Sequence, residues 1–148
     1  MKTIAVIVGV MLLCGGRALQ SQGQVPAPIE EGLKALRTGG TDPAAAAVAP
    51  WTRTWTTPAD SGKRTGLEHG LRELVTYAGA LKDWDVVKIV DVTPHVKRVY
   101  LVLVFERQPV YAMFVAYRPA SDWIVTSVNF HTDPARIFPS TVLEPEKP

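Results

Sequence analysis

The chain has 148 residues, with 16 Lys or Arg, 14 Asp or Glu and one cysteine. Its formal net charge of +2 comes from Lys2 and Arg17, so the chain after residue 18 is formally neutral. A neutral chain has no net basic surface, which argues against a nucleic-acid partner. About 125 residues would remain, enough for one domain with its own core.

The first 18 residues have the pattern of a secretory signal peptide. A basic start precedes an apolar run from Ile4 to Cys14, and small residues continue to Ala18. This order predicts a signal peptide over Met1–Ala18 and a secreted or periplasmic protein. The apolar run is too short for a comfortable transmembrane helix, so we expect no membrane span after cleavage.

A second interpretation of this segment is a lipoprotein signal ending at Cys14. Leu13 stands where a small residue is expected, so lipidation at Cys14 is the less favoured alternative. Cys14 is the only cysteine, and its removal would leave a mature protein held together without disulfides.

The next part of the chain predicts a stalk and two short helices. Leu19–Ala27 contains Gln and Pro and is expected to be a flexible stalk. A helix is predicted over Pro28–Arg37 and ends at the following Gly-Gly pair. Asp42 is the expected N-cap of a second helix, which begins at Pro43 and continues through Ala49.

Trp51 and Trp55 can share one face of either a helix or a strand. An exposed pair would suit stacking on a sugar, whereas packing in the core or at its rim is the favoured interpretation. After a polar loop over Pro58–Lys63, the clearest helix is predicted over Gly66–Leu81. Its capping box would be Thr65 and Glu68.

Strands rich in β-branched and aromatic residues follow. They are predicted over Asp85–Asp91, Val96–Glu106, Pro109–Tyr117 and Trp123–His131. The expected fold is therefore α+β, with helices packed on a curved antiparallel sheet of about four strands. The domain would span residues 28–139, and residues 140–148 are expected to form a mobile tail.

Alternation along the strands divides their side chains between two faces. A two-residue turn at Arg107-Gln108 would pair Leu103 with Ala112, and a three-residue turn would pair Phe114 with Thr126. The inner face, which the long helix should cover, would then consist of Val99, Leu101, Leu103, Phe105, Val110, Ala112, Phe114, Ala116, Ile124, Thr126, Val128 and Phe130. The outer face would consist of Arg98, Tyr100, Val102, Val104, Tyr111, Met113, Val115, Tyr117, Trp123, Val125, Ser127, Asn129 and His131.

The order of these elements, together with Tyr111–Tyr117, Asp122–Val125 and Asn129–Asp133, resembles the nuclear-transport-factor-2-like superfamily. Its members include ketosteroid-isomerase-like and SnoaL-like proteins. The resemblance covers about Ile29 to Phe138. It implies a cone-shaped domain, a pocket between the sheet and the long helix, and dimers formed sheet to sheet. Enzymes, carriers and interaction domains share this fold, so the resemblance leaves function open.

Acid–base catalysis requires a titratable group at the reacting atom, and the expected inner face offers only Thr126. The weak catalytic candidates are Asp91, Tyr100 and His131. The candidates for contact with a ligand or partner are Tyr111, Tyr117, Asn129 and His131. The three histidines lack the spacing of a metal site, so neither a metal nor a cofactor is expected.

These observations favour a secreted or periplasmic binding or interaction domain without catalysis. We expect it to be a homodimer through its sheet, with a small apolar ligand or an envelope protein as a further partner. The alternative is a small-molecule enzyme of the ketosteroid-isomerase or SnoaL-like kind. That alternative requires a sheet register shifted by one residue, so that Tyr117, Asn129 and His131 face the long helix.

Overall fold

The computed structural model describes residues 23–144. The expected signal peptide, Cys14 and residues 145–148 lie outside this part of the chain. The elements are α1 (Ala27–Thr38), α2 (Pro43–Trp51), α3 (Pro58–Ala78), β1 (Leu81–Thr93), β2 (Val96–Phe105), β3 (Pro109–Tyr117), β4 (Ile124–His131), the 3₁₀ turn η1 (Pro134–Arg136) and α4 (Ser140–Leu143). Within residues 23–144, none of the helices combines the length and the apolar character needed to cross a membrane.

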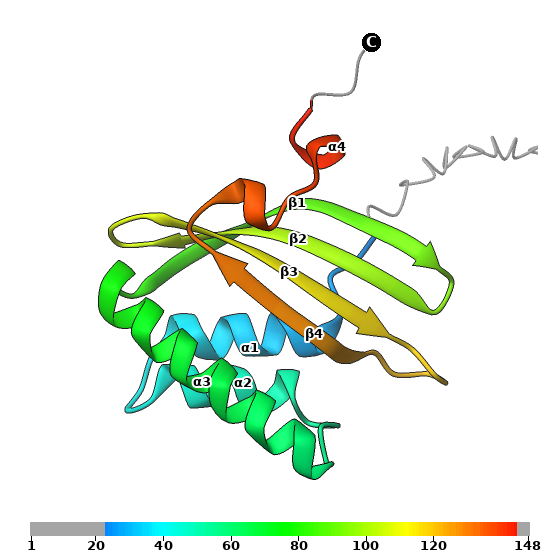
Figure 1. Cartoon of the computed structure of the whole chain (residues 1–148), viewed down its shortest axis with the longest axis horizontal. Helices are drawn as coiled ribbons and strands as arrows, with labels where there is room; N and C mark the ends of the chain where they lie inside the picture. Colours follow the sequence, from blue (N-terminus) through cyan, green and yellow to red (C-terminus); the bar gives the residue numbers. More distant parts are fainter. Residues whose placement is uncertain (1–22, 145–148) are drawn as a thin grey trace, which may run out of the picture.

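The four strands form an antiparallel meander in the order β1-β2-β3-β4. The three long helices lie on one side of this sheet, and η1 and α4 lie on the other (Figure 1). The α+β class and the four-stranded antiparallel sheet predicted from the sequence are therefore confirmed. The predicted bounds of β3, Pro109–Tyr117, are those observed.

The first two helices follow the expected local signals. In α1, Ile29, Leu33 and Leu36 are buried on one stripe. In α2, the Asp42 carboxylate accepts a hydrogen bond from the Ala45 N–H at 3.0 Å, as expected of an N-cap. The side chain of Val25, in the segment expected to be a stalk, packs against the core.

The long helix α3 begins at Pro58, eight residues earlier than Gly66, so the polar loop predicted over Pro58–Lys63 is wrong. Its capping box is made by Thr57 and Asp60: the Asp60 N–H donates to the Thr57 hydroxyl, and the Thr57 N–H donates to the Asp60 carboxylate. Pro58 in the first turn strengthens this start. The predicted end is also wrong, because Leu81 belongs to β1.

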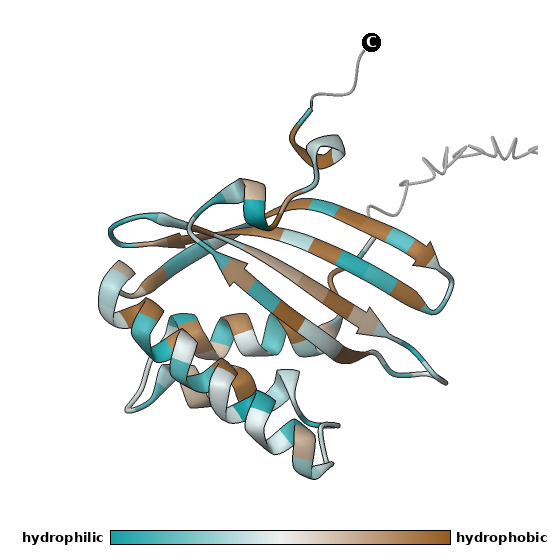
Figure 2. Cartoon of the chain, in the orientation of Figure 1, coloured by the Kyte–Doolittle hydropathy of each residue, from teal (hydrophilic) through white to brown (hydrophobic). Residues whose placement is uncertain are grey.

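The prediction that the long helix lies across the inner face of the sheet is corrected as well. Both α1 and α2 contact the sheet, whereas α3 packs mainly on α2. Gly32 of α1 makes this arrangement possible, since a Cβ there would overlap the indole of Trp51. Trp51 in turn meets Phe114 of β3 edge-on at 5.0 Å between ring centroids. Figure 2 shows many hydrophilic residues along α3, in keeping with its outer position.

The hairpin between β2 and β3 is longer than predicted. Val104 pairs with Pro109 and Leu101 with Ala112, so the two-residue turn is wrong. The backbone N–H groups of Glu106 and Arg107 donate to Ala80 and Ala78, which ties the hairpin loop to the end of α3. The register moves by two residues, an even number, and the predicted faces of β2 and β3 are therefore preserved.

A β-bulge changes the pairing of β3 with β4. The register shifts between Val115 and Ala116, so Phe114 pairs with Val128 instead of Thr126. Val125 pairs with Ala116 and is buried, although it was predicted for the outer face. The bulge exposes Thr126, and its hydroxyl donates to the Val115 carbonyl at 3.2 Å.

The inner face is fully packed along β2 and β3. Its buried residues are Val99, Leu101, Leu103, Phe105, Val110, Ala112, Phe114 and Ala116. They form one cluster with the buried side chains of the helices. On the outer face, Phe138 covers the middle of β2 and part of β3: its ring lies edge-on to Tyr100 at 5.9 Å and to Tyr111 at 5.4 Å. Beyond Phe138 the chain leads away from the sheet (Figure 1).

Candidate functional site

The three candidate catalytic residues do not share a pocket. Asp91 lies near the end of β1, exposed, with its carboxylate 3.3 Å from Lys97 Nζ. His131 ends β4 near the opposite end of the sheet, and its Nδ1 accepts the Asp133 N–H at 2.9 Å. Tyr100 is only 3% exposed, beneath Phe138 on the outer face. The structure therefore separates the three groups.

Three of the candidate contact residues are neighbours on the sheet. Tyr111 pairs with His131 across β3 and β4, and Asn129 pairs with Met113 two positions along the ladder, on the same face. The Asn129 amide donates to the Ser127 hydroxyl at 3.1 Å. Tyr117 lies at the other end of β3, where it is 40% exposed. It does not belong to the same group.

The space between the sheet and the helices was the expected place for a pocket. A shallow cleft of about 490 Å³ does lie between α3 and β4, lined by Trp55, Leu67 and the β4 segment that contains Asn129. Behind it, the layer between helices and sheet is filled by the apolar core. Trp55 is half-buried and donates its indole N–H to the Val125 carbonyl, and Trp51 is buried. The favoured packing role of the two tryptophans is confirmed.

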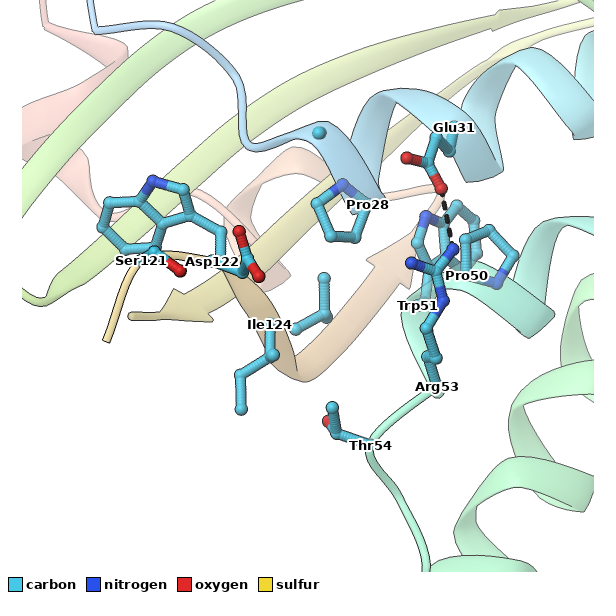
Figure 3. A pocket seen from close by; sticks show the side chains of 12 residues that line it. Pro28, Glu31, Pro50, Trp51, Arg53, Thr54, Ser121, Asp122 and Ile124 are labelled. Carbon is cyan, nitrogen blue, oxygen red and sulfur yellow. Dashed lines mark hydrogen bonds and ion pairs between the residues drawn. The ribbon is translucent and has the colours of Figure 1, made fainter. Parts of the chain in front are cut away.

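A cleft of about 550 Å³ opens where the start of α1, the end of α2 and the start of β4 meet. We call it the acidic cleft. Arg53 and Glu31 form an ion pair of 2.9 Å on one rim, and Asp122 lies on the other (Figure 3). Asp122 has no ion-pair partner among the described residues. The lining thus carries one more negative than positive charge.

A second hollow of about 780 Å³, which we call the basic groove, lies between the segment before α1 and the β1–β2 hairpin. Its lining residues are Gln24, Val25, Pro26, Ala27, Asp91, Val92, Thr93, Pro94, Lys97, Arg118 and Trp123. Trp123 and Ala27 line both the basic groove and the acidic cleft. The indole therefore stands between two hollows whose linings differ in charge.

Two cations lie over the Trp123 ring. Lys97 Nζ is 5.3 Å and the Arg118 guanidinium carbon is 4.9 Å from the ring centroid. The Arg118 side chain donates to the Pro94 carbonyl at 3.1 Å, and its backbone N–H donates to the His95 carbonyl at 2.9 Å. Arg118 is therefore turned toward the β1–β2 hairpin and forms no ion pair with Asp122, although the two residues flank the β3–β4 turn.

The perturbed pKa values belong to structural contacts away from both hollows. Hydrogen bonds from Arg72 and from the Ala45 N–H lower the pKa of Asp42. The Thr57 hydroxyl and N–H lower the pKa of Asp60 in the capping box. Lys82 and the Ala80 N–H lower the pKa of Glu106. These carboxylates stabilise helix ends and a hairpin, so their pKa shifts do not mark a reactive centre.

Within residues 23–144 no three His, Cys, Asp or Glu side chains come together as a metal site. Sequence reasoning missed the grouping of Lys97, Arg118 and Trp123, which come from β2, from the β3–β4 turn and from the residue before β4. Only the Trp at the start of a strand was visible in the sequence. No local spacing could have indicated the two cations beside it.

Comparison with protein-family models, with curated proteins and with solved structures finds no match for this chain. What the domain does has therefore to be inferred from its own surfaces.

Proposed function

We propose that the protein is a secreted or periplasmic binding and interaction domain without catalysis, which forms a homodimer through the outer face of its sheet. The supporting observation is the uncovered part of that face. Val104, next to the β2–β3 hairpin, is 37% exposed, and Tyr117, at the other end of β3, is 40% exposed. Val102, Met113 and Val115 lie between these ends and are half-buried. Exposed apolar side chains on a sheet face suit contact with another protein.

Charges around this surface favour a second copy of the chain. By the strand register, Asp85 and Lys88 of β1 and Arg98 of β2 lie on the outer face, opposite or beside Val102 and Tyr100. All three are exposed, and no ion pair within residues 23–144 involves them. In a two-fold dimer the same patch faces itself, so Asp85 of one copy can approach Lys88 or Arg98 of the other.

The remaining parts of the proposal rest on other observations. Secretion follows from the pattern of the first 18 residues alone. A relationship to the nuclear-transport-factor-2-like superfamily is supported by three helices followed by a four-stranded meander. A ketosteroid-isomerase-like enzyme is the alternative, and it would need acid–base groups in one pocket. The separation of Asp91, Tyr100 and His131 argues against it.

The dimer is tested by measuring the solution mass of the chain by sedimentation. We expect the wild type to be a dimer and Val104→Asp to be a monomer, because the new carboxylate would be buried without a partner in the interface. Val86→Asp is the matched control: Val86 is 46% exposed on the neighbouring strand and pairs with Leu101, a residue of the inner face. A monomeric wild type, or a Val104→Asp variant that stays dimeric, would refute the proposal.

A further inference from the structure

We propose that the basic groove binds a small amphipathic carboxylate, with the carboxylate on Arg118 and the apolar body against Trp123. This inference goes beyond the dimer, since the groove lies between the segment before α1 and the β1–β2 hairpin and does not use the exposed outer-face residues Val104 and Tyr117. It rests on charge, on the fixed position of a guanidinium and on the chemistry of the groove lining.

The charges of the groove leave one cation available. Asp91 forms an ion pair with Lys97 at 3.3 Å, and the Lys97 side chain is only 16% exposed. Arg118 has no carboxylate partner among residues 23–144. The lining therefore carries a net charge of one positive unit, which suits a monoanion.

The Arg118 side chain is held in a position from which it can bind a carboxylate. Its side chain is only half-exposed, rests on the Trp123 ring at 4.9 Å and donates one hydrogen bond to the Pro94 carbonyl. A guanidinium has five N–H donors, so a single bond leaves others for a ligand. A guanidinium held in place by an aromatic ring and a carbonyl loses little further entropy when it binds a carboxylate.

The groove also presents apolar side chains beside its charges. Val25, Pro26, Val92, Pro94 and the Trp123 ring surround the two cations. A fully hydrated inorganic anion would leave these surfaces without a partner, whereas a short hydrocarbon or aromatic body would cover them. The first turn of α1 also opens at this groove, at Ala27, and has no side-chain cap. The positive end of the helix dipole adds a modest preference for negative charge.

The neighbouring acidic cleft also indicates where the charged end of the ligand should lie. Asp122 lies on the other side of Trp123, without an ion-pair partner in the part of the chain that the structure describes. A carboxylate would be repelled from the acidic cleft and attracted to the basic groove. The ligand is therefore expected to occupy the basic groove with its charged end toward Arg118.

The test is a titration of the chain with octanoate, followed by the NMR signal of the Trp123 indole N–H, which Trp123→Phe identifies. We expect a saturable shift of this signal. Neither 1-octanol, which lacks the charge, nor acetate, which lacks the apolar body, should saturate it. Arg118→Gln should weaken octanoate binding about tenfold, because a charge-assisted hydrogen bond is lost.

Two further variants serve as controls for the effect of Arg118→Gln. Arg118→Lys keeps the charge and should bind more tightly than Arg118→Gln, which separates charge recognition from damage to the hairpin. Arg136→Gln removes an exposed arginine on the opposite side of the sheet and should bind as the wild type does. The proposal is overturned if octanoate gives no saturable shift, if 1-octanol binds as tightly, or if Arg118→Gln binds unchanged. Sedimentation of the same samples reports on the dimer separately.

Discussion

The two faces of the sheet are made by alternate residues of the same strands, yet they meet very different surroundings. On the inner face, Leu101 and Phe114 are at most 1% exposed beneath α1 and α2. On the outer face, exposure varies from place to place: Tyr100 is buried by Phe138, and Tyr117 remains 40% exposed. Apolar side chains occur on both faces, so the covering elements, more than the strand residues, decide which face becomes core.

This difference has energetic consequences. A large apolar side chain that is fully buried contributes about 1.5–3 kcal/mol relative to an exposed one. The inner face therefore supplies the stability of the domain, and the outer face keeps apolar surface available for a partner. The following predictions test that division, beginning with the largest expected effect.

Replacing Phe114 by Ala should destabilise the protein strongly. Phe114 is 1% exposed and packs edge-on against Trp51, so its removal leaves a cavity and should cost about 3–5 kcal/mol. Tyr117→Ala, on the same strand but on the outer face, should cost less than about 1 kcal/mol in the monomer. Urea denaturation measures both. Equal losses would mean that the two faces contribute alike.

Replacing Phe138 by Ala should have an intermediate effect. Phe138 is 4% exposed and covers Tyr100 and Tyr111, but it is a single ring on a single segment of the outer face. We expect a loss of about 1–3 kcal/mol in the free energy of unfolding, together with a change in the near-ultraviolet circular dichroism of the tyrosines. Leu143→Ala is the control, since Leu143 is 50% exposed in α4. If both variants unfold as the wild type does, Phe138 does not hold the outer face.

The smallest expected effect is a loss of stability at low pH. The pKa values of Asp42, Asp60 and Glu106 are all lowered in the folded state, and all three residues lie at the helix ends or at the hairpin that meets α3. A lowered pKa contributes stability that is present above the ordinary values of 3.8 and 4.5. That stability is lost as the pH falls through the lowered values. The protein should therefore unfold more readily below about pH 4.

Asp42→Asn separates this effect from capping. Asn can still accept the Ala45 N–H, but it gives up the ion pair of 2.7 Å with Arg72. The unfolding midpoint of Asp42→Asn should therefore change less between pH 5 and pH 3 than that of the wild type. This pH range spans 3.8, the ordinary pKa of an aspartate side chain. Asp122→Asn, at an exposed carboxylate that forms no ion pair within residues 23–144, serves as the control. A variant that follows the wild-type profile would show that the Asp42–Arg72 contact has no part in the acid response.

Local signals predicted some elements closely and missed others for identifiable reasons. Asp42 before Pro43 was enough to place α2, because an N-cap acts within one turn. The start of α3 was missed because the Thr65 and Glu68 pattern imitates a capping box. In the structure Thr65 instead donates to the Ser61 carbonyl inside the helix. The sequence thus contains two possible capping boxes, and the helix begins at the one formed by Thr57 and Asp60.

The candidate sites show a sharper limit. Asp91, Tyr100 and His131 were selected for their chemistry, and the sheet places them in three separate surroundings. Lys97 and Arg118 carried no local signal, since they lie 26 and 5 residues from Trp123. Only the pairing of β2 with β3 and the turn at Arg118 bring both cations to the indole.

The sequence by itself determined the α+β order and the inner face of β2 and β3, because alternation and helix caps act between residues close in the chain. Tertiary structure alone decided the length of the β2–β3 loop, which Ala78 and Ala80 hold through backbone hydrogen bonds. It also decided the bulge that buries Val125 and the cations beside Trp123. These features depend on groups that meet only after the chain has folded, so no short stretch of sequence contains them.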